Sequence, residues 1–126
     1  MATNTPTIGG DGSLRLMVLG QRIVLSRQQV RILALLWQTP GKQLPSAGLY
    51  ALVWQVPFPS AGSPALTQRQ RTSAAMSVRR LHKVGLVRQP RPLWLALSVA
   101  GAQLMHDLTH NWVEWEDYQG RFLDPD

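Results

Sequence analysis

Basic side chains without acidic neighbours dominate this sequence of 126 residues. Of its 13 Lys and Arg, all except Arg121 lie between residues 12 and 106, a stretch without Asp or Glu, so it carries 13 − 1 = 12 positive charges. The acids are Asp11 and six residues after position 106. Like charges repel one another in a compact domain, so both signs normally mix on its surface. The pattern therefore indicates a polyanionic partner, of which phosphate backbone is the commonest, because neutralised phosphates release condensed counterions.

A predicted helix over residues 67–84 carries the densest group of these cations. Thr67 with Gln70 forms a capping-box pattern, and Gly85 is a helix-ending residue. A helix fits the major groove of duplex DNA, where its side chains reach base edges while flanking cations hold phosphates. Helical spacing predicts an apolar, inward face made of Ala74, Val78 and Leu81.

The opposite face of this helix supplies the predicted DNA contacts. Arg80 is our choice for a base contact, because bidentate pairing of Arg with guanine is the commonest specific contact. The alternative is a solvated basic face, which the lack of acids for i,i+4 pairing disfavours. The side chains expected to face the groove are Ser73, Met76, Ser77 and Arg80, and those expected on the sugar-phosphate backbone are Arg69, Arg71, Thr72, Arg79 and Lys83.

A second basic element is a predicted hairpin with strands over 86–88 and 93–97. Arg88 and Arg91 in this hairpin suit contacts to phosphate or to the minor groove. Arg91 lies between two prolines, which fix its backbone and reduce the entropy lost on binding. The alternative is a structural hairpin whose charges are incidental.

One further pattern has the residue types of a metal site. His106 and His110 lie one helical turn apart and resemble the zinc-protease helix motif, with Asp107 in place of the usual Glu. Zinc needs a third ligand, and the only other histidine is His82 in the basic helix. We therefore expect an exposed polar helix face, with no metal or other cofactor. Because the sequence has no cysteine and no convergent set of serine, histidine and carboxylate, we expect no enzyme activity.

The elements that would position these residues follow from local patterns. Residues 1–12 are expected to be a flexible leader, and strands over 14–19 and 22–25 form a predicted hairpin with a type II′ turn at Gly20-Gln21. The further expected elements are a helix from Ser26, with Gln29 in a capping box, to Thr39-Pro40-Gly41, a helix over 46–55, a proline-rich loop over 56–65, and a helix from Ser98 to about Trp112 before an acidic tail.

This order predicts an α+β fold, namely a winged helix-turn-helix with an N-terminal β-hairpin, a three-helix core, a C-terminal wing hairpin and an extra C-terminal helix. The DNA-binding domain would cover residues 13–97. Residues 98–126 would form the C-terminal helix and the acidic tail.

Over about residues 14–97 the sequence resembles the effector domain of OmpR/PhoB-type response regulators. The Leu-Thr pair, the Asn-Pro-Gly turn and the final Val-Trp of that family correspond, without a gap, to Leu25-Ser26, Thr39-Pro40-Gly41 and Val53-Trp54. Its Arg-Thr and Arg-Arg-Leu correspond to Thr72-Ser73 and Arg79-Arg80-Leu81. The resemblance implies a winged helix that binds DNA through the same helix and the wing.

The sequence departs from that family in several places. Pro45 replaces the serine that normally caps the second helix, and Pro90 and Pro92 stand near the glycines of the wing tip, which predicts a stiffer tip. The 126 residues include no receiver domain, so we do not expect control by aspartyl phosphorylation.

Two alternatives to sequence-specific DNA binding stay open. In one, the winged helix is a protein-interaction module that contacts RNA polymerase or another regulator. Phe58 and the loop over 56–65 would make that contact, because this loop occupies the place where the resembling family contacts polymerase. In the other, the chain coats double-stranded DNA without sequence preference.

An apolar stripe in the C-terminal helix is a further candidate for partner binding. Met105, Leu108 and Trp112 share one face of that helix. We expect the stripe to form a homodimer interface, which would place two recognition helices on half-sites about one helical turn apart. The alternative is that it completes the core of the monomer. With no run near the ~18 apolar residues of a membrane span and no signal peptide, we expect a cytoplasmic protein without a membrane partner.

Overall fold

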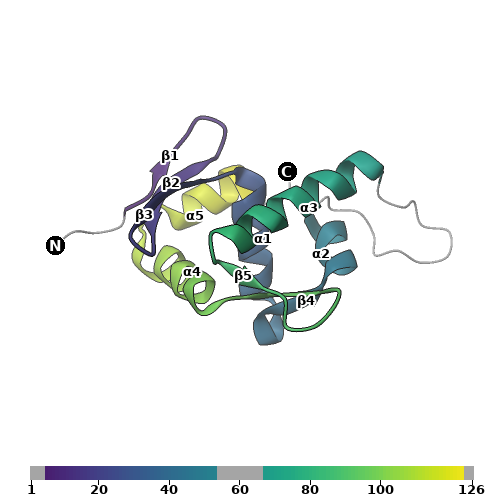
Figure 1. Cartoon of the computed structure of the whole chain (residues 1–126). Helices are drawn as coiled ribbons and strands as arrows, with labels where there is room; N and C mark the ends of the chain where they lie inside the picture. The colour runs from purple at the N-terminus through teal and green to yellow at the C-terminus, as the bar shows by residue number, and fades with distance from the viewer. Residues whose placement is uncertain (1–4, 54–66, 124–126) are drawn as a thin grey trace.

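The computed structural model describes residues 5–53 and 67–123. Within these ranges the fold is mixed α+β, with two three-stranded antiparallel sheets and five α-helices (Figure 1). The predicted loop over 56–65, with Phe58, and Trp54 lie outside the described residues. None of the described helices has the length and the apolar content that crossing a bilayer requires.

The N-terminal sheet contains β1 (Thr7–Ile8), β2 (Leu14–Val18) and β3 (Gln21–Leu25), in the order β1-β2-β3. Residues of β2 alternate between buried and exposed, as expected for a strand with one face on the core. Because residues 7–8 form a strand that pairs with β2, the predicted flexible leader over 1–12 is wrong at these positions.

The turn between β2 and β3 lies one residue earlier than predicted. Its central residues are Leu19 and Gly20, with φ of 51° and 79°, and positive φ at both positions is typical of a type I′ turn rather than type II′. This register pairs Leu14 with Leu25. The predicted turn would have placed Leu14 opposite Arg27, which already belongs to the following helix.

Three helices form the centre of the molecule: α1 (Arg27–Gln38), α2 (Ser46–Val53) and α3 (Gln68–Lys83). Both predicted capping boxes are present, at Ser26 with Gln29 and at Thr67 with Gln70. After the C-cap Thr39, the short 3-10 turn η1 (Pro40–Lys42) ends α1 as predicted. Five apolar side chains of α1 are buried, which makes it the central helix: Val30, Ile32, Leu33, Ala34 and Leu36.

The second sheet contains β4 (Gln43–Pro45), β5 (Val87–Arg88) and β6 (Trp94–Leu97), in the order β4-β6-β5. The predicted hairpin is present as β5 and β6. The sequence did not predict β4, which follows η1 directly and pairs with β6. The backbone amide of Ser46 then donates to the carbonyl of Leu93 at 2.8 Å, so the start of α2 is tied to the hairpin.

The apolar stripe of the C-terminal helix is not the exposed dimer interface that the sequence predicted. After α4 (Val99–Asn111) come α5 (Trp115–Tyr118) and the π-helical turn η2 (Gln119–Leu123). The stripe of α4 packs on the core of its own chain, where Met105, Leu108 and Trp112 are 0%, 2% and 8% exposed. These side chains are therefore not available to a second copy, and the arrangement is the alternative in which the stripe completes the monomer.

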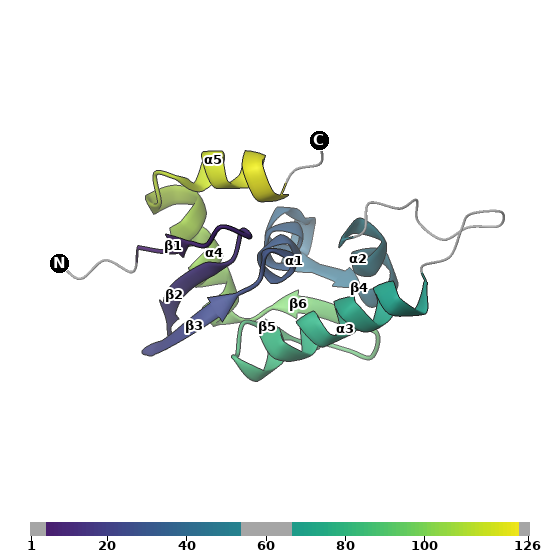
Figure 2. The ribbon, with the colours of Figure 1, turned by 90° about the horizontal axis from the view of Figure 1, so that it is seen from above.

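The segment predicted as an acidic tail also docks on the body. Trp115, Tyr118 and Leu123 are buried, and the Tyr118 hydroxyl donates to the Gly12 carbonyl at 2.5 Å. Arg27 in α1 donates through Nε to the Phe122 carbonyl at 2.5 Å. Seen from above, α5 and α3 lie on opposite sides of α1 (Figure 2), so the basic helix and the docked C-terminal segment occupy different faces of the molecule.

Candidate nucleic-acid interface

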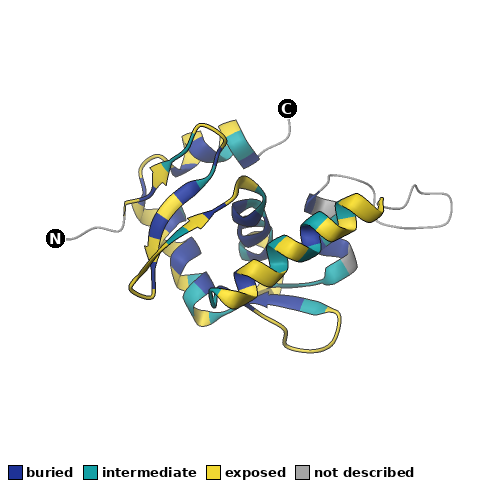
Figure 3. Ribbon diagram, turned by 45° about the horizontal axis from the view of Figure 1, so that its top comes forward, coloured by how far each residue is buried: buried dark blue, intermediate teal, exposed yellow. Residues whose placement is uncertain are grey.

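The outward face of α3 is exposed along the whole helix (Figure 3). Its inward face carries Ala74 and Leu81, both fully buried, and Val78, which is half-buried. The helix therefore presents one continuous surface to solvent, as its apolar periodicity predicted. The predicted contact residues that are exposed on this surface are Arg69, Arg71, Thr72, Met76, Arg79, Arg80 and Lys83.

Two predicted groove contacts are engaged within the chain. The Ser77 hydroxyl donates to Oε1 of Gln28 at 2.5 Å, and the Ser73 hydroxyl donates to the same oxygen at 3.4 Å. Both serines are half-buried, because α1 begins beside the middle of α3. A base edge would have to replace Gln28 to reach either hydroxyl. Ser73 and Ser77 therefore hold α1 against α3 in this structure.

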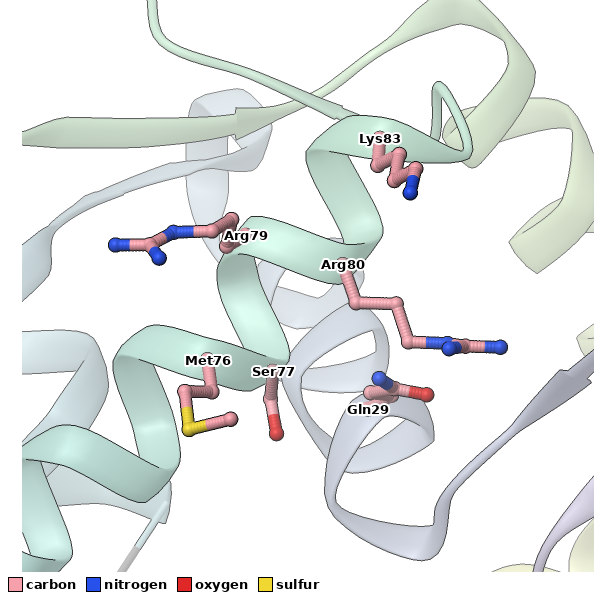
Figure 4. Close-up of a pocket in the computed structure, with 6 residues that line it drawn as sticks. All are labelled: Gln29, Met76, Ser77, Arg79, Arg80 and Lys83. Carbon is pink, nitrogen blue, oxygen red and sulfur yellow. The ribbon is translucent and has the colours of Figure 1, made fainter.

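A cleft of about 400 Å³ lies where the first turn of α1 meets α3. Figure 4 shows Gln29 of α1 on one side and side chains of α3 on the other. Gln29 is only 5% exposed, and its Oε1 accepts the Ser26 amide at 2.8 Å in the capping box. The side chains that line the cleft are Gln29, Met76, Ser77, Arg79, Arg80 and Lys83.

Four cations of α3 have no carboxylate partner within the described residues. Within residues 5–53 and 67–123, Arg69, Arg79, Arg80 and Lys83 make no ion pair with a carboxylate. Carboxylates that do pair with basic groups lie in the C-terminal region, as Asp117 does with Arg121 at 3.5 Å. At these four side chains the positive potential is therefore not cancelled by ion pairs within the described residues, and it is available to an anionic partner.

The hairpin carries the second predicted basic group. Arg88 and Arg91 are both exposed. The Arg91 guanidinium stacks over the Trp94 ring at 3.9 Å from its centroid, and the Trp94 amide donates to the Arg91 carbonyl at 3.1 Å. Stacking restricts the long Arg91 side chain while leaving its N–H edge free to donate. Arg91 is thus positioned by Trp94 as well as by the flanking prolines.

The two histidines of the motif in α4 stack on each other, with ring centroids 4.4 Å apart and an interplanar angle of 17°. The His106 ring also packs against the Trp37 ring in a T-shaped arrangement, with centroids 6.5 Å apart. His110 Nδ1 lies 3.1 Å from the His106 carbonyl oxygen. In the described part of the chain, no group of three or more His, Cys, Asp or Glu is placed to hold a metal ion.

Sequence reasoning missed Gln28 and Gln29 as part of this surface. It assigned Gln29 only to the capping box, and it gave Gln28 no role. The available signal was the pair of polar residues Gln28 and Gln29 in the first turn of a helix whose N-cap is Ser26. Which surface those glutamines meet depends on the packing of α1 on α3.

Comparison of the chain with protein-family models, with curated proteins and with solved structures gives no match.

Proposed function

We propose that the protein binds duplex DNA as a winged helix-turn-helix regulator of transcription. In this proposal α3 enters the major groove, and the hairpin of β5 and β6 is the wing that contacts the backbone or the minor groove. The order of the elements supports it, with a sheet, three helices and then a hairpin, and so does the resemblance to OmpR/PhoB-type effector domains.

The observation that carries the proposal is the exposed face of α3, which holds several cations in a chain region of +12 without one acid. A protein that only needed solubility would mix both signs on such a face. A helix of 16 residues spans about 24 Å at ~1.5 Å per residue, so it is long enough to lie across a major groove and contact both flanking backbones.

Two substitutions separate base reading from backbone contact. Arg80→Ala is expected to weaken binding by about 1–3 kcal/mol and to relax the preference at one base pair. Lys83→Ala is expected to weaken binding to all sequences alike. It should also make the slope of log affinity against log salt concentration shallower by about one unit, because about one fewer counterion is released. Arg121→Ala is the matched control, because it removes the same charge from the C-terminal segment, where Arg121 pairs with Asp117.

The measurement is fluorescence anisotropy of labelled duplexes, drawn from a random pool and from selected sequences, at two salt concentrations. Wild-type protein that binds no duplex at low salt would refute the proposal. Equal, sequence-independent effects of Arg80→Ala and Lys83→Ala would instead favour non-specific DNA coating.

A further inference from the structure

We infer that the cleft between the first turn of α1 and α3 binds one phosphodiester of the DNA backbone, with the side-chain amide of Gln29 as a hydrogen-bond donor. The inference rests on the proposed function and adds a second helix to the contact surface.

Gln29 is the residue that points to a ligand. Gln29 is 5% exposed, and its Oε1 accepts the Ser26 amide. Its Nε2 has no hydrogen-bond partner among residues 5–53 and 67–123, and it is not one of the described side-chain atoms that are buried without a partner. In Figure 4 the nitrogen end of this amide faces α3, across the cleft, while the oxygen end points away. Nε2 therefore reaches solvent in the cleft, where an acceptor would replace water as its partner.

The surroundings of Gln29 favour an anion. The cleft lies at the N-terminus of α1, a helix of 12 residues whose first amides carry the positive end of its dipole. Gln28 accepts hydrogen bonds from Ser73 and Ser77, which fixes the first turn of α1 beside α3. The helix end is therefore held in one position, which lowers the entropy lost when a ligand binds.

Two cations complete the donor set. Arg80 and Lys83 line the cleft, and neither pairs with a carboxylate in the described residues. Arg80 extends from α3 across the position of Gln29 (Figure 4). A phosphate oxygen that accepts the Gln29 amide would also lie near charged donors, and hydrogen bonds to charged groups are about twice as strong as neutral ones.

A backbone phosphodiester fits the cleft better than a free anion does. The cleft opens beside Met76, whose side chain is 63% exposed on the outward face of α3. An open cleft does not enclose a small ion, but it can receive a phosphate that a duplex presents while α3 lies in the groove. Backbone amides and helix N-termini are common phosphate contacts in protein–DNA interfaces.

Gln29→Glu tests the inference with little risk to folding. Glu at this position keeps the oxygen that accepts the Ser26 amide, and it is the other common residue of a capping box. The carboxylate removes the amide donor and places a negative charge in the cleft. Gln38→Glu is the matched control, because it makes the same change at the exposed last residue of the same helix. Thermal unfolding of each variant checks that both fold.

We expect Gln29→Glu to bind duplex at least about ten-fold more weakly than Gln38→Glu at low salt. The slope of log affinity against log salt concentration should also be shallower by about one unit, because about one fewer counterion is released. Equal affinities of the two variants would overturn the cleft assignment while leaving the proposed function intact. Absence of binding by the wild-type protein would refute the proposed function itself, and the assignment with it.

A second measurement distinguishes the source of the phosphate. In ¹H–¹⁵N spectra, the side-chain amide of Gln29 is identified by its loss in Gln29→Glu. A short duplex should shift this signal, while inorganic phosphate at the same phosphate concentration should leave it in place. Equal shifts with inorganic phosphate would identify a site for free anions and overturn the assignment to the DNA backbone.

Discussion

Replacement of Gly101 by alanine tests how α4 is seated on the second sheet. A Cβ built at Gly101 lies 2.0 Å from the Leu86 carbonyl oxygen and 3.3 Å from Cδ2 of Leu97. The same Leu86 oxygen accepts the Ser98 amide at 3.0 Å, at the start of α4. Because the nearest atom belongs to the backbone, it cannot rotate away as a side chain would. In Gly101→Ala the helix must move back from Leu86, by about 1.5 Å if an ordinary contact distance is restored.

The expected magnitude follows from three contributions. Overpacking in a closely packed site is unfavourable by about 1–3 kcal/mol. Movement of α4 also weakens the bond between Ser98 and Leu86, which contributes about 1 kcal/mol. Alanine recovers about 1 kcal/mol through its higher helix propensity. We therefore expect Gly101→Ala to lower the free energy of unfolding by about 1–3 kcal/mol, toward the upper end because the obstacle is backbone.

Urea denaturation followed by tryptophan fluorescence measures this change. With a slope of about 1–3 kcal/mol per M, the midpoint should fall by about 1 M. Gly120→Ala is the control, because a Cβ at Gly120 meets no atom within 4 Å, so this variant should be as stable as the wild type or slightly more stable. If Gly101→Ala has the same midpoint as Gly120→Ala, the close approach of α4 to Leu86 is refuted.

Three further predictions concern the C-terminal segment. Truncation after Ser98 should leave an unfolded chain by circular dichroism, because it removes the buried side chains of α4 and α5; a folded truncated monomer would contradict this. Trp115→Ala should lower the free energy of unfolding by about 3–5 kcal/mol in urea, as for other buried aromatics, whereas an unchanged midpoint would place Trp115 outside the core. Burial raises the pKa of Tyr118 from 10.0 to about 12, so the neutral phenol is the form that folding favours. The associated stabilisation should be complete below pH 10 and lost as the pH rises toward 12, and Tyr118→Phe should remove this alkaline loss in unfolding titrations; an identical loss in the variant would assign it to another group.

The parts of the fold that the sequence predicted correctly are those specified by neighbouring residues. The N-termini of α1 and α3 are capped by Ser26 and Thr67. Each cap depends on a partner three positions later, so both capping boxes can be recognised in a short window of sequence. The apolar periodicity of α3 likewise identified Ala74 and Leu81 as buried. The exposed basic face of α3 follows from the same pattern, because a helical periodicity needs no information about distant partners.

The parts that failed depend on distant partners. Strand β4 is three residues long and ends in Pro45, and it is a strand only because β6 supplies the pairing. Leu19 adopts a positive φ, which leucine disfavours by about 1–2 kcal/mol, because the register set by Leu14 and Leu25 requires it. Helical spacing identified the stripe of α4 correctly, but it cannot tell whether the same chain or a second copy covers that stripe.

The hydrogen bonds that fix the docked segment have a consequence for the order in which the chain can fold. Tyr118 and Gly12 are 106 positions apart, and Phe122 and Arg27 are 95 positions apart. During synthesis the N-terminal sheet and α1 leave the ribosome before these partners, so these contacts form only when residues 118–122 have emerged. Contacts of such sequence separation slow folding, because a long loop must close first. The nascent chain is therefore expected to hold α1 without these C-terminal contacts until residues 118–122 have emerged, although α1 lies at the centre of the fold.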